Sequence, residues 1–262
     1  MIDTDRYGPW AVVAGGSEGV GAAFATELAA AGTNLVLIAR KPEPLQETAR
    51  QARELGAEVR TLALDLLAAD AVDRIARETA DIEVGLLVYN AGANSYGSEF
   101  ATGELDRLRA VVDLNITRQL DLVHLFAPAM RERGRGGIVL VGSMSGYMGA
   151  PNQSVYSASK AFTNVFAESL WVELEPHGVD VLDLVLGVTR TPAMQRAGLD
   201  FDIPGMLVAE PVDVAREGLA HLTDGPVWIA GGNYAAVRKR AEFPRTDRVR
   251  AAAEGMRALM RR

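Results

Sequence analysis

The sequence contains no cysteine and only three histidines, and these absences restrict the chemistry it can carry out. Without cysteine the chain can form no disulfide bond and offers no thiolate nucleophile. His124, His177 and His221 have no cysteine or second histidine at the spacing of metal ligands, so we expect no metal site. No segment approaches the roughly 18 uninterrupted apolar residues of a membrane span. The N-terminal stretch MIDTDRYGPW lacks the apolar centre of a signal peptide, and we expect a soluble, cytoplasmic protein without stable membrane insertion.

Positive charge is also scarce. The chain has 27 Lys and Arg residues against 34 Asp and Glu residues, which gives a formal net charge of −7 at pH 7. A surface of this sign repels nucleic acids and anionic membranes, so neither is an expected partner. The 262 residues are 48% hydrophobic and show no linker or break in composition, and we expect a single domain over residues 1–262.

Short apolar runs alternate with longer stretches of helical period, which is typical of βαβ units. The predicted strands are residues 10–14, 34–39, 58–64, 84–89, 137–142, 179–186 and 226–231. The predicted helices are residues 20–32, 42–55, 69–79, 104–131, 154–175 and 211–222. This order predicts an α/β fold: a Rossmann-type, doubly wound parallel sheet with helices on both faces.

Two segments fall outside this alternation. Residues 187–210 mix Pro and Gly with scattered apolar residues, and so long a connection usually closes over a site, so we expect a substrate loop there. Residues 245–261 predict an amphipathic helix, with Val249, Ala253, Met256 and Met260 on one face. We expect it to dock on its own chain or a second subunit. A role at a membrane surface is the weaker alternative, because the apolar face is mostly Ala and Met.

A glycine-rich turn, VVAGGSEGVG at 12–21, follows the first predicted strand and opens the first helix. In this setting backbone N–H groups and the helix dipole face a bound anion, and the missing side chains allow close approach. The spacing, Gly15-x-x-x-Gly19-x-Gly21, therefore indicates a pyrophosphate site, although a flexible surface turn is an alternative.

The end of the second predicted strand indicates which dinucleotide binds. An NAD site usually carries Asp or Glu there for the ribose 2′-hydroxyl, whereas this chain has Arg40 and Lys41. Two cations suit a 2′-phosphate, and Arg40 could stack on adenine or grip the phosphate. Ser17 could add a hydrogen bond from the turn. Alternatively, Arg40 and Lys41 are two solvated charges at a strand end. We predict NADP(H) as the cofactor.

Tyr156 and Lys160 lie four positions apart on a predicted helix and so share one face. Ser143 ends the fifth predicted strand, at the edge where open α/β sheets bind ligands. An ammonium beside a phenol, together with oxidised nicotinamide, favours the phenolate, so Tyr156 could act as acid and base. Ser143 could bind the substrate oxygen. Alternatively, Tyr156 and Lys160 are a pair of side chains on a helix surface and Ser143 is an ordinary turn residue, none of them with a catalytic role.

Over residues 8–232 the sequence resembles the short-chain dehydrogenase/reductase family. The matching motifs are AGGSEGVG, Asp65 in LALDL, Asn90-Ala91-Gly92, Asn115 in VDLNI, Ser143, YSASK at 156–160 and Thr191-Pro192. The resemblance implies a reaction centred on Ser143, Tyr156, Lys160 and Asn115, with Asn115 anchoring a water that relays protons to Lys160. It implies cofactor contacts with Gly15, Ser17, Glu18, Gly19, Val20, Gly21, Arg40, Lys41, Asp65, Leu66, Asn90, Ala91, Gly92, Tyr156, Lys160, Val188 and Thr191.

The chain departs from the family pattern at three places. Leu186-Gly187 replaces the usual Pro-Gly, and Ala14 replaces the Thr that opens the glycine motif. The C-terminus lacks the common ending. The family implies a homodimer or homotetramer, with helices 104–131 and 154–175 as the dimer face, and the unusual ending puts the usual tetramer interface in doubt.

Within the family, YGPWAVVAGGSEGVGAAF, LVLGVTRTP and VWIAGGN are similar to bacterial NADP-dependent 7β-hydroxysteroid dehydrogenases. This implies a bulky apolar alcohol or ketone as substrate, with steroids and bile acids as candidates. The residues expected around the substrate are Met144, Tyr147, Met148, Met194, Phe201, Ile203 and Met206, although local core positions are an equal alternative.

Two other functions remain open. One is a β-ketoacyl thioester reductase, which would need a basic patch for an acyl carrier, with Arg131, Arg133 and Arg135 as candidates. The other is an NADP-sensing regulator without turnover, which predicts a degraded set of catalytic residues rather than the intact one found.

Overall fold

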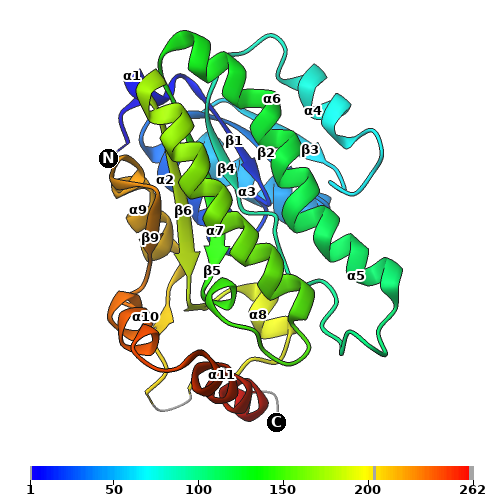
Figure 1. The fold of residues 1–262 in the computed structure, drawn as a ribbon. Helices are drawn as coiled ribbons and strands as arrows, with labels where there is room; N and C mark the ends of the chain where they lie inside the picture. The colour runs from blue at the N-terminus through cyan, green and yellow to red at the C-terminus, as the bar shows by residue number, and fades with distance from the viewer. Residues whose placement is uncertain (1, 203–204, 260–262) are drawn as a thin grey trace.

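Seven parallel strands form the central sheet of the computed structural model, which describes residues 2–202 and 205–259 (Figure 1). In spatial order the strands are β3 (Val59–Ala63), β2 (Asn34–Ala39), β1 (Trp10–Ala14), β4 (Val84–Tyr89), β5 (Gly136–Ser143), β6 (Val179–Leu186) and β9 (Val227–Ile229). In the centre Val12 is in register with Val36 of β2 and Leu87 of β4. The strand order reverses at β1, so the carboxyl ends of β1 and β4 flank the crevice where such sheets bind ligands.

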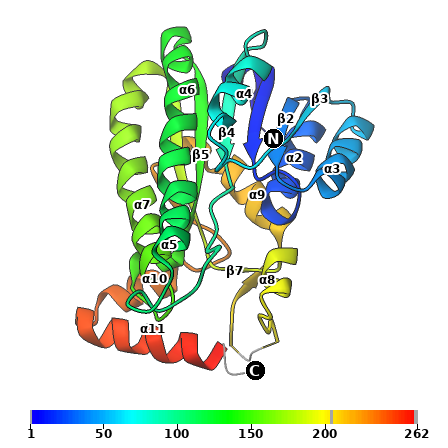
Figure 2. The ribbon, with the colours of Figure 1, turned by 90° about the vertical axis from the view of Figure 1, so that its right-hand side faces the viewer.

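Helices cover both faces of the sheet, as predicted (Figure 2). On one side lie α4 (Ala71–Glu78), α5 (Leu105–Val112), α6 (Arg118–Arg133) and α7 (Ser154–Leu174). On the other lie α2 (Gly19–Ala30), α3 (Pro42–Glu54) and α9 (Pro211–Ala220). Two apolar cores result: one joins Phe24 of α2 to Val13 of β1, and the other joins Leu122 of α6 to Leu87 of β4. Because both faces of the strands are buried, their sequences are continuously apolar instead of alternating.

The predicted helix over 104–131 is interrupted, which corrects the sequence-based expectation. After α5 the chain forms a π-helical segment, η1 (Asp113–Thr117), before α6 resumes. Apolar periodicity does not reveal one extra residue in a turn. The interruption turns Asn115 into the interior, where it is fully buried.

Residues 187–210 contain short elements that the sequence did not indicate: β7 (Val188–Thr189), α8 (Pro192–Arg196) and β8 (Val208–Ala209). β7 and β8 pair in parallel, so they tie the two ends of this segment together. Ile203 lies outside the described residues. The remaining short helices are α1 (Thr4–Tyr7), η2 (Met144–Tyr147), η3 (Glu175–His177) and η4 (Leu222–Asp224).

Two helices follow the last strand, α10 (Tyr234–Ala241) and α11 (Arg245–Leu259), and both lie at the carboxyl edge of the sheet (Figures 1 and 2). On the predicted apolar face of α11, Val249 and Ala253 are half-buried. Met260 lies outside the described residues, and α10 was not predicted. None of the helices within the described ranges is long and apolar enough to cross a membrane.

Candidate active site

The glycine-rich turn forms a cradle that has no room for side chains. Gly15 has φ +85°, and a Cβ there would lie 3.0 Å from the backbone of Ala91. A Cβ at Gly21 would lie 2.0 Å from the Gly15 carbonyl oxygen and 2.6 Å from Asn90 Nδ2, which donates to that oxygen at 3.0 Å. α2 begins at Gly19, and Glu18 at its N-cap makes no side-chain capping bond. The cradle and helix N-terminus fit the pyrophosphate of a nicotinamide dinucleotide.

The adenosine end of the predicted cofactor site lies where β2 and β3 end side by side. Ala39 of β2 is in register with Ala63 of β3, which brings Arg40 and Asp65 to neighbouring turns. Arg40 and Lys41 are exposed and enter none of the ion pairs found in the described residues. Asp65 accepts a hydrogen bond from the Leu67 amide at 3.0 Å.

Three further residues that were predicted to contact the cofactor also have structural roles. Leu66 and Val20 are buried in the core, and the Ser17 carbonyl accepts a hydrogen bond from Thr48 Oγ1 at 3.2 Å. The Ser17 backbone therefore anchors the turn to α3.

Glu18 forms an ion pair that the sequence did not predict. Arg196 of α8 donates to Glu18 Oε2 at 3.0 Å, and this bond holds the pKa of Glu18 below its usual range. Lys41 and Arg40 act in the same direction at longer range. The ion pair ties the loop over 187–210 to the glycine-rich turn.

Thr191 strengthens the same connection. A Cβ at Gly19 would lie 3.0 Å from Thr191 Cγ2, so the loop packs directly against the turn. Thr191 Oγ1 accepts from the Met194 amide at 3.2 Å and caps α8. Val188 pairs with Val208 at the base of the loop. Of these two predicted cofactor contacts, Thr191 therefore lies beside the cradle and Val188 lies at the base of the loop.

Ser143, Tyr156 and Lys160 come together at the carboxyl end of β5. Ser143 is the last residue of that strand, and its Oγ accepts from the Ser145 amide at 3.1 Å. Tyr156 and Lys160 project from the start of α7, with Lys160 Nζ 5.8 Å from the centre of the Tyr156 ring. Tyr156 is hydrogen-bonded with Ser143.

Asn115 completes the group from the π-helical segment, a feature that often marks functional sites. Its Nδ2 donates to the carbonyl oxygens of Ala93 and Val111, each at 2.9 Å. Its Oδ1 has no hydrogen-bond partner within the described chain. A Cβ at Gly92 would lie 2.6 Å from Asn115 Oδ1 and 2.7 Å from Lys160 Nζ, so both polar atoms converge on this glycine.

Burial shifts the pKa values of the two titratable groups of this cluster, Lys160 and Tyr156. It lowers the pKa of Lys160 to about 8, while its Nζ donates to the Val141 carbonyl oxygen at 2.8 Å. Burial also raises the pKa of Tyr156, and the hydrogen bond with Ser143 opposes this only in part. Without the positive charge of oxidised nicotinamide, on which the expected shift toward the phenolate depends, Tyr156 is protonated at neutral pH.

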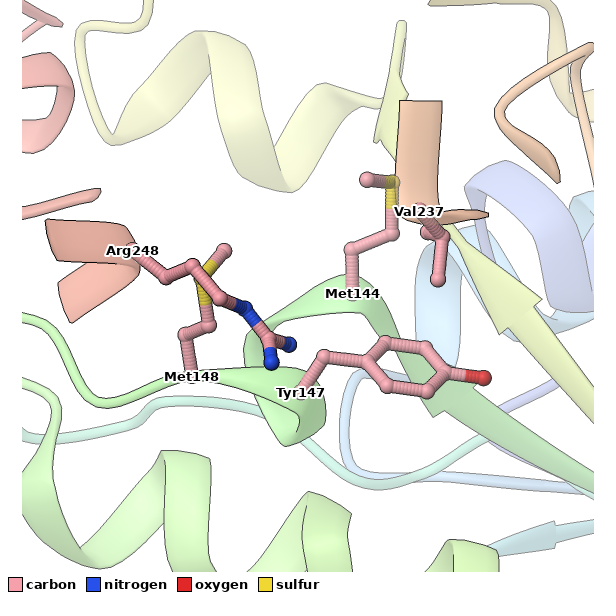
Figure 3. Close-up of a pocket in the computed structure, with 5 residues that line it drawn as sticks. All are labelled: Met144, Tyr147, Met148, Val237 and Arg248. Atoms are coloured by element: carbon pink, nitrogen blue, oxygen red, sulfur yellow. The ribbon is translucent and has the colours of Figure 1, made fainter. Parts of the chain in front are cut away.

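A small pocket opens next to Ser143, where η2 meets the C-terminal helices (Figure 3). It is lined by Met144, Tyr147, Met148, Val237 and Arg248. Arg248 extends from α11 past Met148 toward Tyr147, and its Nε has no hydrogen-bond partner among the described residues. Three predicted substrate-side residues are thus together. Val237 and Arg248 could not be predicted, because nothing in the sequence relates α10 and α11 to η2.

The proposed basic patch for an acyl carrier lies at the opposite edge of the sheet. Arg133 donates to the Val84 carbonyl oxygen at 2.7 Å, where β4 begins. Arg135 forms an ion pair with Glu83 at 2.6 Å. Because Ser143 and the cradle lie at the carboxyl ends of the strands, these arginines do not face the site.

A model of the short chain dehydrogenase family matches residues 9–200. A 7β-hydroxysteroid dehydrogenase of Clostridium sardiniense is 31% identical over 228 residues, which covers 87% of each chain. A very-long-chain 3-oxoacyl-CoA reductase of Podospora anserina is 38% identical over 196 residues, or 73% of this chain but only 57% of that protein.

Two solved structures support the same relationship. One, from a study of 7β-hydroxysteroid dehydrogenase stereoselectivity, has a TM-score of 0.87 and 27% identity, covering 96% of this chain and 99% of that one. The other, a short-chain dehydrogenase from Sphingobium yanoikuyae in complex with NADPH, has a TM-score of 0.78 and 30% identity, covering 89% and 92%.

Proposed function

Because the chain belongs to the short-chain dehydrogenase/reductase family, we propose that it is an NADP(H)-dependent enzyme that interconverts a secondary alcohol and a ketone on a bulky apolar substrate. Membership itself makes it an oxidoreductase of hydroxyl or keto groups that uses a nicotinamide dinucleotide. The observation that carries the proposal is the cluster at the end of β5, where Tyr156 is bonded with Ser143 and Lys160 lies behind it.

In reduction, Tyr156 donates its phenolic proton to the substrate carbonyl oxygen, while Ser143 holds that oxygen by a hydrogen bond. The nicotinamide, when bound, supplies or accepts the hydride at the adjacent carbon. The raised pKa of Tyr156 suits the donor role, since burial keeps the phenol protonated. In oxidation Tyr156 must accept the proton instead, and the Lys160 ammonium favours the phenolate by its charge.

Lys160 and Asn115 supply the path by which Tyr156 exchanges its proton with solvent. Asn115 Oδ1 and Lys160 Nζ both approach Gly92. Asn115 Oδ1 accepts no hydrogen bond from the described chain, so it is free to accept one from a water. An amide oxygen and an ammonium that both approach one glycine can hold a water between them. We assign Asn115 to this water and Lys160 to the nicotinamide ribose.

NADP(H) is favoured over NAD(H) by the charges at the end of β2. Arg40 and Lys41 are exposed and have no carboxylate partner in the described chain, so both remain available to a 2′-phosphate. The one acid in the glycine-rich turn, Glu18, is neutralised by Arg196. The complex of the Sphingobium enzyme with NADPH supports the same choice.

The cofactor preference is tested by comparing NADPH and NADH in the parent and in Arg40→Asp. We expect the variant to lose affinity for NADPH by about tenfold or more, because a charged hydrogen bond is worth about 1.5–3 kcal/mol, while NADH binding is retained. Arg77→Ala, an exposed arginine on α4, is the control. A parent that prefers NADH would contradict the proposal.

The apolar side chains that line the pocket beside Ser143 support an apolar substrate. Met144, Tyr147 and Met148 follow Ser143 directly, and flexible methionine walls suit large apolar ligands. The relatives that act on hydroxysteroids make steroids and bile acids the first substrates to test. Arg248 is the single charge in the lining, so the panel should pair acidic steroids with neutral ones of the same ring system.

Assembly into a dimer or tetramer is also part of the proposal. Apolar side chains are exposed along α5, α6 and α7: Leu105 (52%), Val112 (36%), Leu120 (38%), Val165 (61%) and Val172 (62%). They support these helices as a face between subunits. Light scattering on the purified protein would distinguish a monomer, which would contradict this part, from an oligomer.

The substrate proposal is tested by following NADPH absorbance with oxosteroids, oxo-bile acids, 3-oxoacyl thioesters and small ketones. We expect the oxosteroid group to give the highest kcat/KM. A preference for 3-oxoacyl thioesters, the substrates named for the Podospora relative, would replace the steroid assignment and retain the chemistry. Cofactor binding with no turnover on any ketone would instead favour a sensing role.

A further inference from the structure

Two ionisable side chains of opposite charge are buried next to the reaction site. In the part of the chain that the structure describes, Lys160 (3% exposed) is the only buried lysine or arginine, and Asp183 (1% exposed) is the only buried aspartate or glutamate. Lys160 has a role in the proposed reaction, whereas Asp183 has none so far. A buried charge costs free energy unless another group compensates it, so the presence of Asp183 needs an explanation.

Asp183 interrupts the apolar run of β6, VDVLDLVL, the strand between β5 and the edge strand β9. Asn164 Nδ2 of α7 donates to its Oδ2 at 3.2 Å, but its Oδ1 accepts no hydrogen bond from any described residue. On the neighbouring strand, a Cβ at Gly142 would lie only 2.0 Å from Oδ1. The chain therefore leaves space for a carboxylate directly beside the residue that precedes Ser143.

The carboxylate and the Lys160 ammonium lie on either side of this same short segment of β5. Lys160 Nζ donates to the carbonyl oxygen of Val141, and Asp183 packs against Gly142. Asn164, which binds Asp183, follows Lys160 by one turn of α7. Burial raises the pKa of Asp183 to about 7, and the Asn164 hydrogen bond and the Lys160 charge oppose that rise. Asp183 in turn raises the pKa of Lys160, so each charge stabilises the other.

The other titratable groups around Asp183 are few. Glu168 of α7 acts on it from the solvent-exposed side of the helix and raises its pKa, and Tyr147 of η2 faces it from the substrate pocket. The adjacent strands β5 and β9 carry no titratable side chain. Lys160 is thus the only cation that acts on Asp183 among the described residues.

We propose that Asp183 is a positioning residue for the reaction, whose buried carboxylate keeps the Lys160 ammonium charged and directed into the active site. The inference rests on the proposed function, in which that ammonium binds the nicotinamide ribose and favours the phenolate of Tyr156. Burial lowers the pKa of Lys160 to about 8 even though Asp183 acts in the opposite direction, so the lysine loses its charge in mildly alkaline solution. The Asp183 carboxylate opposes this deprotonation of Lys160, so removing the carboxylate should make Lys160 lose its proton at lower pH.

The test is the pH dependence of kcat/KM for the parent and Asp183→Asn, measured from about pH 6 to about pH 10. A nearby opposite charge shifts a pKa by about one unit or more, so the alkaline limb of the pH profile should move to lower pH by about that much. Alkaline activity should then fall by roughly tenfold, while near pH 6 the two enzymes should agree within about twofold. NADPH affinity should follow the same pH dependence, because Lys160 also binds the ribose.

Asp180→Asn is the matched control on the same strand. Asp180 accepts from Arg6 Nε at 2.6 Å and from Tyr7 Oη at 2.8 Å, where β6 begins and far from Ser143. Its loss should lower the melting temperature and leave the pH profile unchanged. Asp183→Asn should do the reverse: it should keep or raise the melting temperature, because it removes a buried charge, and shift the profile.

An unchanged alkaline limb in Asp183→Asn would overturn the proposal. If that variant does not fold, Asp183→Ala decides the same question, and failure of both to fold would show a purely structural carboxylate and also overturn it. Tyr156→Phe separates this inference from the proposed function. Activity retained in Tyr156→Phe contradicts the function itself, whereas an inactive Tyr156→Phe with an unshifted Asp183→Asn contradicts only the role of Asp183.

Discussion

Gly92→Ala tests the geometry of the site most sharply, because one methyl group would meet two of its polar atoms. The added Cβ would lie 2.6 Å from Asn115 Oδ1 and 2.7 Å from Lys160 Nζ. An unstrained contact needs about 3.5 Å, so each atom must withdraw by about 1 Å. Gly92 has no positive φ, so its backbone accepts alanine without strain.

The effects on folding and on activity should differ in size. The atoms in the way are the ends of side chains, which can move, so we expect the free energy of unfolding to fall by only about 1–2 kcal/mol. A displacement of about 1 Å in a reacting group costs roughly 10²-fold in rate, or about 2.7 kcal/mol on the barrier. We therefore expect kcat to fall about a hundredfold in a protein that remains folded.

Urea unfolding and steady-state kinetics with NADPH measure the two effects separately. Gly97→Ala is the control, because a Cβ there would meet Asn152 and Asn94 at an ordinary 3.4 Å, and it should change stability by less than about 0.5 kcal/mol. Parental kcat in Gly92→Ala would refute the placement of Asn115 and Lys160. A loss of stability above about 4 kcal/mol would refute the argument that these side chains can yield.

Three further substitutions test other parts of the molecule. Gly21→Ala puts a Cβ 2.0 Å from the Gly15 carbonyl oxygen, and because backbone must move, we expect loss of NADPH binding in titrations and lower stability by about 1–3 kcal/mol. Arg196→Ala breaks the pair that lowers the pKa of Glu18; such a pair stabilises the fold above the unfolded pKa of about 4.5. Its effect on the melting temperature should therefore be present at neutral pH and vanish as pH falls through the lowered pKa, and a difference that persists in acid would contradict this assignment. Phe24→Ala removes a fully buried ring and should cost about 3–5 kcal/mol in urea unfolding, whereas a cost below about 1 kcal/mol would contradict its place in the core.

Much of the sheet and site could be predicted because local patterns specify them. Continuous apolar runs located the seven strands to within two residues at their ends, since strands buried on both faces need them. The spacing of Tyr156 and Lys160 predicted one helix face, and Ser143 was predicted at a strand end. These residues are close in the structure because parallel strands place their carboxyl ends at one edge.

The features that were missed depend on contacts between distant segments. In the π-helical turn Asn115 donates hydrogen bonds to the carbonyl oxygens of Ala93 and Val111, and periodicity does not encode such contacts. The ion pair of Glu18 with Arg196 joins positions 178 residues apart. Asp183 did leave a signal, an acid inside an apolar strand, but only the folded structure shows that it lies beside Lys160.

The proposed reaction depends most directly on Tyr156 as the proton donor. The decisive measurement is kcat for NADPH-dependent reduction of the best ketone in Tyr156→Phe, with the NADPH dissociation constant measured on the same sample. Tyr234→Phe, an exposed tyrosine on α10, is the control. We predict a fall in kcat of about 10²–10⁴-fold with NADPH affinity unchanged within about twofold. A Tyr156→Phe enzyme that keeps the parental kcat would contradict the central claim.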